Sequence, residues 1–526
     1  MHPQILRIGL LISVSLYFMG CSTLPPGSDY PKQRSVMTLA PDATRLGQRI
    51  ESATRQHAGQ SGFRMISVGV DGFLMRLEAI NAAERTLDLQ YYIFHGDESG
   101  RLLTEALVRA ADRGVQVRIL VDDGETEAGD EQVFTLHAHS NIEIRVYNPW
   151  AYRGHRKMLR RLEFLLHHSR LDYRMHNKLL VADNTVALVG GRNIGDQYFQ
   201  IDPESQFADD DVFVAGPLVP QLSGTFDEFW NSTLAIPTAA FARPGSIAQS
   251  RPAAHQEMIR KAGFDYEGKL ARGQPFDDLV SGKTSLVWAA ALVACDSPEK
   301  KKVLEGERAG SLMYQSVAQA IGQVRTELLM ITPYLIPSRG ELNLLDERQA
   351  QGARVAILTN SLESAPDLSA HSGYAHYRKP LLLHGIELYE VRAQLDSVRG
   401  SGQSARISSY GTYALHGKLL VFDRSRVYIG SMNFDRRSHH LNTEIGLIID
   451  SPELSQQVAA RFRSMTQPES AYAVALQPAS STRSARLVWR TREGDLDTEL
   501  TSEPARSHWQ KFKVHLLSLL PLDGEL

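Results

Sequence analysis

Two copies of one short pattern constrain this chain of 526 residues more than any other feature. Residues 176–183 and 416–423 both read His-x-Lys-x4-Asp, and each is followed seven positions after its Asp by Gly-x-x-Asn, at 190–193 and 430–433. Three fixed positions match by chance at roughly one start in 8,000. Two matches with the same continuation therefore predict a duplicated unit whose copies share one function.

The residue types within the pattern indicate acid–base and nucleophilic chemistry. Side chains two positions apart in a strand project to the same face, so we expect the His and Lys of each copy to point together into a site. Each Asp falls at the turn before the next strand, and we expect it to support the site rather than to make bonds. The predicted catalytic motifs consist of His176, Lys178, Asp183, His416, Lys418 and Asp423.

Cleavage of a phosphodiester requires a nucleophile, a proton donor for the leaving oxygen and positive charge for the phosphoryl oxygens. One imidazole can attack phosphorus and form a phospho-enzyme, and a second can carry the proton. The lysines supply the charge, and the amides of Asn193 and Asn433 supply hydrogen-bond donors. This chemistry requires no metal and no cofactor, and no Cys/His cluster in the sequence has zinc-like spacing.

Helical and strand-like patterns alternate in both halves of the chain, which predicts an α/β architecture. In the first half we expect helices over 70–84 and 102–111 and strands over 87–94 and 115–121. In the second half we expect a helix over 317–324 and strands over 328–336 and 355–358. The fold class is therefore a duplicated α/β/α sandwich, with two lobes and one composite site at their interface.

The expected domains follow from these patterns and from composition. They are a signal peptide (1–20), a lipidated tether and N-terminal extension (21–60), an N-terminal lobe (61–234), an inter-lobe insertion with little core of its own (235–308), a C-terminal lobe (309–470) and a C-terminal extension with an amphipathic helix (471–526).

The N-terminal residues are typical of an export signal. Arg7 precedes an apolar run over 8–19, which is too short for a permanent membrane helix. The run ends at Gly20-Cys21, where Cys21 would become the lipidated first residue of a lipoprotein facing the periplasm; an ordinary signal peptide or a short anchor are the alternatives. Inner and outer membrane are left undecided.

The charge balance argues against a nucleic-acid-binding protein without excluding one, and the cysteine content excludes a disulfide framework. The chain has 57 basic and 60 acidic residues, a net charge of −3, so it lacks the basic excess typical of nucleic-acid-binding proteins, and we expect no nucleic-acid partner. Its two cysteines, Cys21 and Cys295, cannot form a disulfide framework. Cys295 ends an apolar run and is expected to be a buried, inert thiol.

The paired motifs resemble those of the phospholipase D superfamily, which has a duplicated α/β sandwich. The resemblance implies that His176 is the nucleophile and His416 the acid/base, while the lysines, Asn193 and Asn433 bind phosphate. Glu444, which we group with the substrate-binding residues, resembles the carboxylate that orients the His of the opposite motif. Its counterpart for the other His would lie among residues 209–211, three consecutive aspartates whose register stays open.

Further segments are similar to bacterial cardiolipin synthases, and the last two to their C-type branch: 89–93, 331–334, 358–362, 488–491 and 509–513. The resemblance implies transfer of a phosphatidyl group between membrane phospholipids through a phospho-histidine. Hydrolysis to phosphatidic acid, a phosphodiesterase or nuclease, and a non-catalytic membrane lipoprotein are the alternatives. The expected partners are phospholipid substrates and a membrane surface; a protein partner stays unknown.

Two amphipathic helices would suit a lipid substrate. Residues 155–168 combine leucines with arginines as in helices that lie on anionic membranes, although a helix packed on its own lobe is equally compatible with the pattern. Near the C-terminus Trp509, Phe512 and Leu516 recur at helical spacing, with Lys511 and Lys513 opposite. For this second stripe we favour packing against a core.

Overall fold

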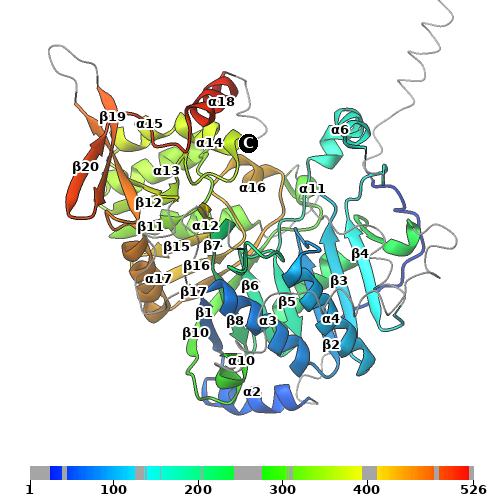
Figure 1. Cartoon of the computed structure of the whole chain (residues 1–526). Coiled ribbons are helices and arrows are strands. Elements are labelled where there is room, and N and C mark those ends of the chain that lie inside the picture. The colour runs from blue at the N-terminus through cyan, green and yellow to red at the C-terminus, as the bar shows by residue number, and fades with distance from the viewer. Residues whose placement is uncertain are drawn as a thin grey trace, which may run out of the picture.

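The computed structural model describes residues 24–37, 44–124, 136, 139–153, 156–202, 205–241, 275–304, 306, 312–393, 412–478 and 485–519. The signal peptide and Cys21, predicted from the sequence, lie outside these ranges. No helix within them is long and apolar enough to cross a membrane. The ranges form two α/β lobes that lie side by side (Figure 1).

The N-terminal lobe is built on a mixed sheet with the strand order β9-β4-β3-β2-β5-β6-β8-β1, in which only β2, β3 and β4 pair in parallel. The strands are β1 (Ser61–Ile66), β2 (Thr86–Tyr91), β3 (Gln116–Asp122), β4 (Ile142–Tyr147), β5 (Leu179–Ala182), β6 (Val186–Gly190), β8 (Asp211–Ala215) and β9 (Ala235–Pro237).

Helices cover both faces of this sheet. On one face lie α2 (Arg45–Gln56), α3 (Gly69–Ala82), α4 (Glu98–Asp112) and α10 (Pro275–Val280), and on the other lies α7 (Val219–Trp230). The helical spacing read from the sequence is the buried face of α3, where Phe73, Leu77 and Ile80 are almost fully enclosed. Asp97 caps the start of α4, because its carboxylate accepts from the N–H of Gly100.

The C-terminal lobe repeats this arrangement with the order β18-β13-β12-β11-β15-β16-β17-β10. Its strands are β10 (Val287–Cys295), β11 (Glu327–Ile331), β12 (Arg354–Asn360), β13 (Glu387–Val391), β15 (Leu419–Phe422), β16 (Arg426–Gly430), β17 (Ile445–Asp450) and β18 (Ala471–Gln477), extended by β19 (Arg486–Glu493) and β20 (Leu496–Leu500). Helices α12 (Met313–Gly322), α13 (Arg339–Ala350), α14 (Leu368–Ala375) and α15 (Arg378–Leu383) cover one face, and α17 (Pro452–Met465) the other.

The expected duplicated α/β sandwich is confirmed, but the expected inter-lobe insertion over 235–308 is wrong within the described residues. β9 is the edge strand of the first lobe. β10 pairs with β1 over Val287–Ala289 and with β17 over Ala290–Cys295, and so joins the two sheets into one. β10 corresponds to β1 in the repeat, because each lies beside the last strand of its lobe's hairpin. Its composition concealed this role, since an alanine-rich apolar run carries no alternation.

The tether predicted after Cys21 is also wrong from residue 24 onward. The carbonyl of Gln33 accepts from buried Arg145 at 2.7 Å, and the Ser35 hydroxyl accepts from the indole N–H of Trp230 at 2.9 Å. The N–H of Met37 donates to Asp227 at 2.7 Å. Residues 33–37 are therefore bound to the N-terminal lobe, and the Pro, Ser and Gly residues before them include a turn over 26–29.

Candidate active site

The backbone of His176 is held by the opposite lobe. The sequence predicted that His176 and Lys178 lie within a strand, but they lie in an extended segment just before β5. The N–H of His176 donates to the carbonyl of Thr443 at 2.9 Å, and Met175 forms a parallel bridge with the same residue. The prediction failed because the N–H of His176 pairs across the lobe interface rather than within the sheet.

His416 is held in the reciprocal way. It lies between β14 (Thr412–Leu415) and β15, and the N–H groups of His416 and Gly417 donate to the carbonyl of Ala208 at 2.8 and 2.9 Å. β14 pairs in parallel with β7 (Ser205–Ala208) from the first lobe. Each motif is therefore completed by the other lobe, and the two motifs meet at one interface.

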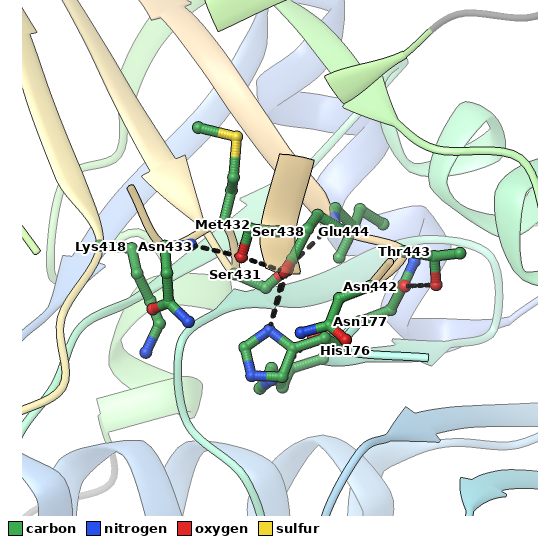
Figure 2. A network of polar contacts seen from close by, with 12 residues as sticks. His176, Asn177, Lys418, Ser431, Met432, Asn433, Ser438, Asn442, Thr443 and Glu444 are labelled. Carbon is green, nitrogen blue, oxygen red and sulfur yellow. Dashed lines mark hydrogen bonds and ion pairs between the residues drawn. The ribbon is translucent and has the colours of Figure 1, made fainter. Parts of the chain in front are cut away.

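Glu444 lies against the imidazole of His176, with its Oε2 2.9 Å from Nδ1 (Figure 2). The same carboxylate accepts hydrogen bonds from the hydroxyls of Ser431 and Ser438. It is fully buried and its oxygens are engaged by these three donors. Glu444 thus contacts the histidine of the opposite motif, whereas its grouping with the substrate-binding residues has no support in this arrangement.

Asp209 is the corresponding partner of His416, with its Oδ2 2.6 Å from Nδ1. The two aspartates that follow it are used elsewhere. Asp210 pairs with Arg461, and Asp211 pairs with Arg76 and Arg192. The register left open in the sequence is therefore settled in favour of Asp209.

Two residues that no sequence motif marks, Asp296 and Lys300, hold the backbone around Glu444 in place. The Asp296 carboxylate accepts from the N–H of Glu444 at 3.0 Å and from the ammonium of Lys300 at 2.8 Å. Lys300 is fully buried and also donates to the carbonyls of Ser438 and Asn442. Both lie in the segment predicted as an insertion, and no motif in the sequence marks them.

The two lysines lie beside the imidazoles of their own motifs. The ammonium of Lys178 donates to the carbonyl of His176 at 2.7 Å, and that of Lys418 lies 2.9 Å from Nδ1 of His416. Both are about 99% buried. Burial holds the pKa of Lys178 well below its usual value and lowers the pKa of Lys418 to about 8, against the opposing charges of Asp209 and Glu444.

The two asparagines differ in their engagement. The side chain of Asn193 accepts from the N–H of Ile93 at 3.1 Å and donates to the hydroxyl of Tyr198 at 3.0 Å. The Oδ1 of Asn433 is buried without a hydrogen-bond partner, and its amide lies beside Lys418 (Figure 2). Because Oδ1 can only accept, it is the amide nitrogen of Asn433, together with the ammonium of Lys418, that suits the oxygen atoms of an anionic ligand.

The motif aspartates hold the sheet rather than a substrate. Asp183 has φ 52° at the β5–β6 turn, and its carboxylate accepts from the N–H groups of residues 84–86 at 2.8–3.0 Å. Asp423 does the same for residues 325–327. Burial would raise the pKa of Asp423, but these N–H groups outweigh it and hold the pKa below its usual value.

Asp183→Ala is expected to lower the free energy of unfolding by about 2–4 kcal/mol, because three N–H groups lose their acceptor and Ala is strained at positive φ. Asp183→Asn keeps an acceptor and tolerates this φ, so it should cost about half as much. Urea denaturation measures the difference. If Asp183→Ala kept the stability of the wild type but lost its turnover, Asp183 would instead take part in the reaction.

Aromatic rings that the sequence motifs do not mark as site residues enclose both imidazoles. The ring of Tyr92 meets His176 edge-on at 5.2 Å and lies 5.4 Å from the ammonium of Lys178. Tyr198 and Phe207 flank His416 at 5.1 and 5.2 Å. These rings exclude water and fix the orientation of the imidazoles. In the sequence, Tyr198 and Phe207 are marked only by closeness to Asn193 and Asp209, whereas Tyr92 lies in the segment 89–93 that resembles cardiolipin synthases.

The charge states of the two imidazoles are coupled across the interface. Burial and the nearby Lys178 and Lys418 hold the pKa of His176 well below its usual value. Burial and Lys418 lower the pKa of His416 to about 3, and Lys178 adds to this shift while Asp209 opposes it. Each histidine thus experiences the lysines of both motifs, as expected for one composite site.

The carboxylates beside the two histidines differ in charge state. Burial would raise the pKa of Asp209, but His416 and Lys418 outweigh it and hold the pKa below the usual range. Burial raises the pKa of Glu444 to about 7 despite Lys178 and the serine hydroxyls. Both imidazoles are therefore neutral near pH 7, but His416 faces a firmly ionised carboxylate and His176 a weaker one.

The described residues include no group of His, Cys, Asp and Glu side chains arranged to hold a metal ion. His439, one of an adjacent histidine pair, stacks on Tyr314 with ring centroids 3.5 Å apart. Cys295 is half-buried, with its thiol 3.6 Å from the amide of Asn177, and burial raises its pKa well above the usual value. That thiol stays protonated, in keeping with the expected inert side chain.

Comparisons with known proteins agree with this geometry. The family described as "Cardiolipin synthase, PLD-like domain" matches residues 77–230 and 317–466, one match for each lobe. The crystal structure of phosphatidylserine synthase from Haemophilus influenzae Rd KW20 superimposes with a TM-score of 0.51 at 14% identity, over 80% of this chain and 91% of that one. Fold and paired motifs thus define a phospholipase D-like enzyme.

Two curated relatives indicate which phospholipase D-like proteins this chain is similar to. Cardiolipin synthase C of Escherichia coli (strain K12) is 36% identical over 488 residues, which is 91% of this chain and 99% of the relative. The major cardiolipin synthase of Bacillus subtilis (strain 168) is 23% identical over 400 residues, 76% and 67% of the two chains. The chain belongs to the cardiolipin synthase family of phospholipase D-like proteins, and the expected enzyme class, a phospholipid phosphatidyltransferase, is confirmed.

Proposed function

We propose that this protein makes cardiolipin by transferring a phosphatidyl group from one phospholipid to phosphatidylglycerol through a covalent intermediate on His176. The observation that carries the proposal is the pair of reciprocal histidine–carboxylate contacts, His176 with Glu444 and His416 with Asp209. Each contact crosses the lobe interface, and a lysine accompanies each histidine. Such a site holds a nucleophile, a proton carrier and two cations around one phosphate.

In the first step the Nε2 of His176 attacks phosphorus, because its Nδ1 is engaged by Glu444. The ammonium groups of Lys178 and Lys418 neutralise the phosphoryl oxygens, and Asn433 donates from its amide. His416 gives its proton to the leaving alcohol. The phosphate brings negative charge into the site, which raises the pKa of His416 and makes this protonated form accessible.

In the second step His416, now neutral, takes the proton of an acceptor hydroxyl. That oxygen attacks phosphorus, the bond to His176 breaks, and the product diester leaves. A phosphatidylglycerol hydroxyl as acceptor yields cardiolipin, whereas water yields phosphatidic acid. No residue described above discriminates strictly against water, so hydrolysis is the side reaction that the same site would perform.

Membrane attachment belongs to the same proposal. A lipidated Cys21 would keep the enzyme at a periplasm-facing membrane surface. Because Pro25 is already buried and residues 33–37 are bound to the N-terminal lobe, only the three residues 22–24, roughly 10 Å of extended chain, would separate the lipid from the folded body.

Purified protein incubated with labelled phosphatidylglycerol and phosphatidylethanolamine tests the proposal. The expected product is cardiolipin, separated by thin-layer chromatography and identified by mass. Phosphatidic acid as the sole product would assign a hydrolase instead. Cleavage of DNA without any lipid turnover would overturn both lipid reactions, and absence of all activity would favour the non-catalytic alternative.

The dependence of kcat/KM on pH is expected to be a narrow bell between about pH 7 and 8. Below about pH 7 Glu444 gains a proton and no longer holds His176 in the nucleophilic tautomer. Above about pH 8 Lys418 loses its charge and with it the attraction for phosphate. Lys418→Arg should move only the upper limb to higher pH. A flat profile from pH 6 to 9 would contradict this assignment.

A further inference from the structure

Helix α6 (Lys157–Leu171) has the reverse of the usual polarity. Its inward face carries Glu163, which accepts from the N–H groups of Ala151 and Tyr152, and Arg170, which binds the side chain of Asn148. Both charged residues are less than 10% exposed. A helix whose ionic side is buried must turn its other side outward.

The outward face of α6 is apolar. It consists of Met158, Leu159, Leu162, Leu165 and Leu166, of which Met158 is 80% and Leu165 76% exposed. At 100° per residue these five side chains fall within an arc of roughly 120°. Packing of α6 on its own lobe therefore explains the position of its charged side, whereas its apolar side chains stay exposed on the surface.

Helix α18 (His508–Ser518) shows the same feature on the second lobe. Val514 is buried, and Gln510 donates to the carbonyl of Leu362 on the packed side. The opposite stripe is exposed and contains Trp509, Phe512, Leu516 and, directly after the helix, Leu519. The sequence favoured packing of this stripe against a core, and that prediction is wrong.

These two stripes hold nine of the seventeen large apolar side chains that are exposed in the described part of the chain. Such concentration on two short elements is unlike the scattered exposure of ordinary surfaces. Both helices lie at the upper edge of the molecule in Figure 1, one on each lobe. Between them lies α16 (Arg436–His440), which follows Asn433 of the site by three residues.

Cations flank both stripes. Arg156 and Arg161 are exposed on or beside α6, and Lys513 is exposed on α18 with its ammonium 5.6 Å from the ring of Trp509. Apolar side chains bordered by arginine and lysine match the boundary between acyl chains and anionic headgroups. An aromatic pair such as Trp509 and Phe512, stacked at 5.2 Å, suits the same depth.

We propose that α6 and α18 form one two-point docking surface that seats the enzyme on an anionic bilayer with its active-site edge facing the lipid. This inference rests on the proposed function for the source of substrate, but the surface itself stands on exposure and charge. Docking through both lobes at once fixes the orientation of their interface. A phospholipid then needs only to rise from the bilayer into the site.

Nitroxide labels test the contact directly. Labels are placed singly at Leu165→Cys, Phe512→Cys and Leu496→Cys in the full-length Cys21→Ser, Cys295→Ala protein, and vesicles of phosphatidylglycerol and phosphatidylethanolamine are added. Leu496 is the matched control, because it is 73% exposed on the distant β20 hairpin. The labels at 165 and 512 should become accessible to oxygen and shielded from a water-soluble relaxant, while that at 496 stays in water.

Turnover supplies the second readout. Leu162→Glu combined with Leu165→Glu should lower cardiolipin formation from vesicles at least tenfold and leave turnover in detergent micelles within twofold of wild type. The control variant Leu496→Glu should stay within twofold of wild type with both vesicles and micelles. Labels that stay in water while vesicle lipid is converted would overturn the docking surface and leave the function standing. Labels that enter lipid while no lipid is converted would support the docking surface and overturn the proposed function. Labels shielded before vesicles are added, in a dimeric protein, would assign the surface to a second copy.

Discussion

His416→Ala is expected to accumulate a covalent phosphodiester adduct on His176 when the donor carries a p-nitrophenolate leaving group. Such a group departs without a proton, so the first step no longer needs His416. The adduct then persists, because nothing takes the proton of the acceptor. With natural phospholipid donors the same variant should lose on the order of 10³-fold or more in kcat/KM, since a general acid–base contributes about 10²–10⁴.

His176→Ala should form no adduct with either donor and should lose on the order of 10⁵-fold or more, as expected when the nucleophile itself is removed. Intact-protein mass spectrometry detects the adduct, and peptide mapping locates it. His376→Ala, an exposed histidine at the end of α14, is the matched control and should behave as wild type. An adduct on His416 in His176→Ala protein, with none in His416→Ala, would reverse the two roles.

The sequence was sufficient for the fold class and for the chemical core of the site because both depend on repeated local patterns. The helical spacing over 70–84 is the buried face of α3, and the motif histidines recur at constant distances from their aspartates. Glu444 could be assigned from its resemblance to a family position. Each of these signals lies within a short stretch of chain.

The remaining features depend on contacts between segments far apart in the chain. Residues 209–211 are identical in type, and only the tertiary positions of His416, Arg461 and Arg192 give each carboxylate a different partner. The role of β10 depends on two neighbours, one from each lobe. The environment of the leucines of α6 could not be predicted, because an amphipathic pattern does not state which face of a helix is buried. In α6 the buried face is the charged one.

Asp209→Asn and Glu444→Gln are expected to impair different steps, although each removes one buried charge next to a histidine. Asn at 209 still fills the space but no longer stabilises the imidazolium of His416. Proton transfer to the leaving group should then fail, with a loss on the order of 10³–10⁴-fold for phospholipid donors. With the p-nitrophenyl donor, adduct formation should fall by only about tenfold.

Gln at 444 has one oxygen where the carboxylate offered two, so it cannot accept from His176, Ser431 and Ser438 together. His176 then loses the tautomer that exposes Nε2, and adduct formation should fall about 10²–10³-fold with both donors. The low-pH limb of the profile should also disappear. Asp450→Asn, exposed at the far end of β17, is the matched control. If both variants slowed the phospholipid donor and the p-nitrophenyl donor by the same factor, the division of roles would be contradicted. A general loss of packing would give that result.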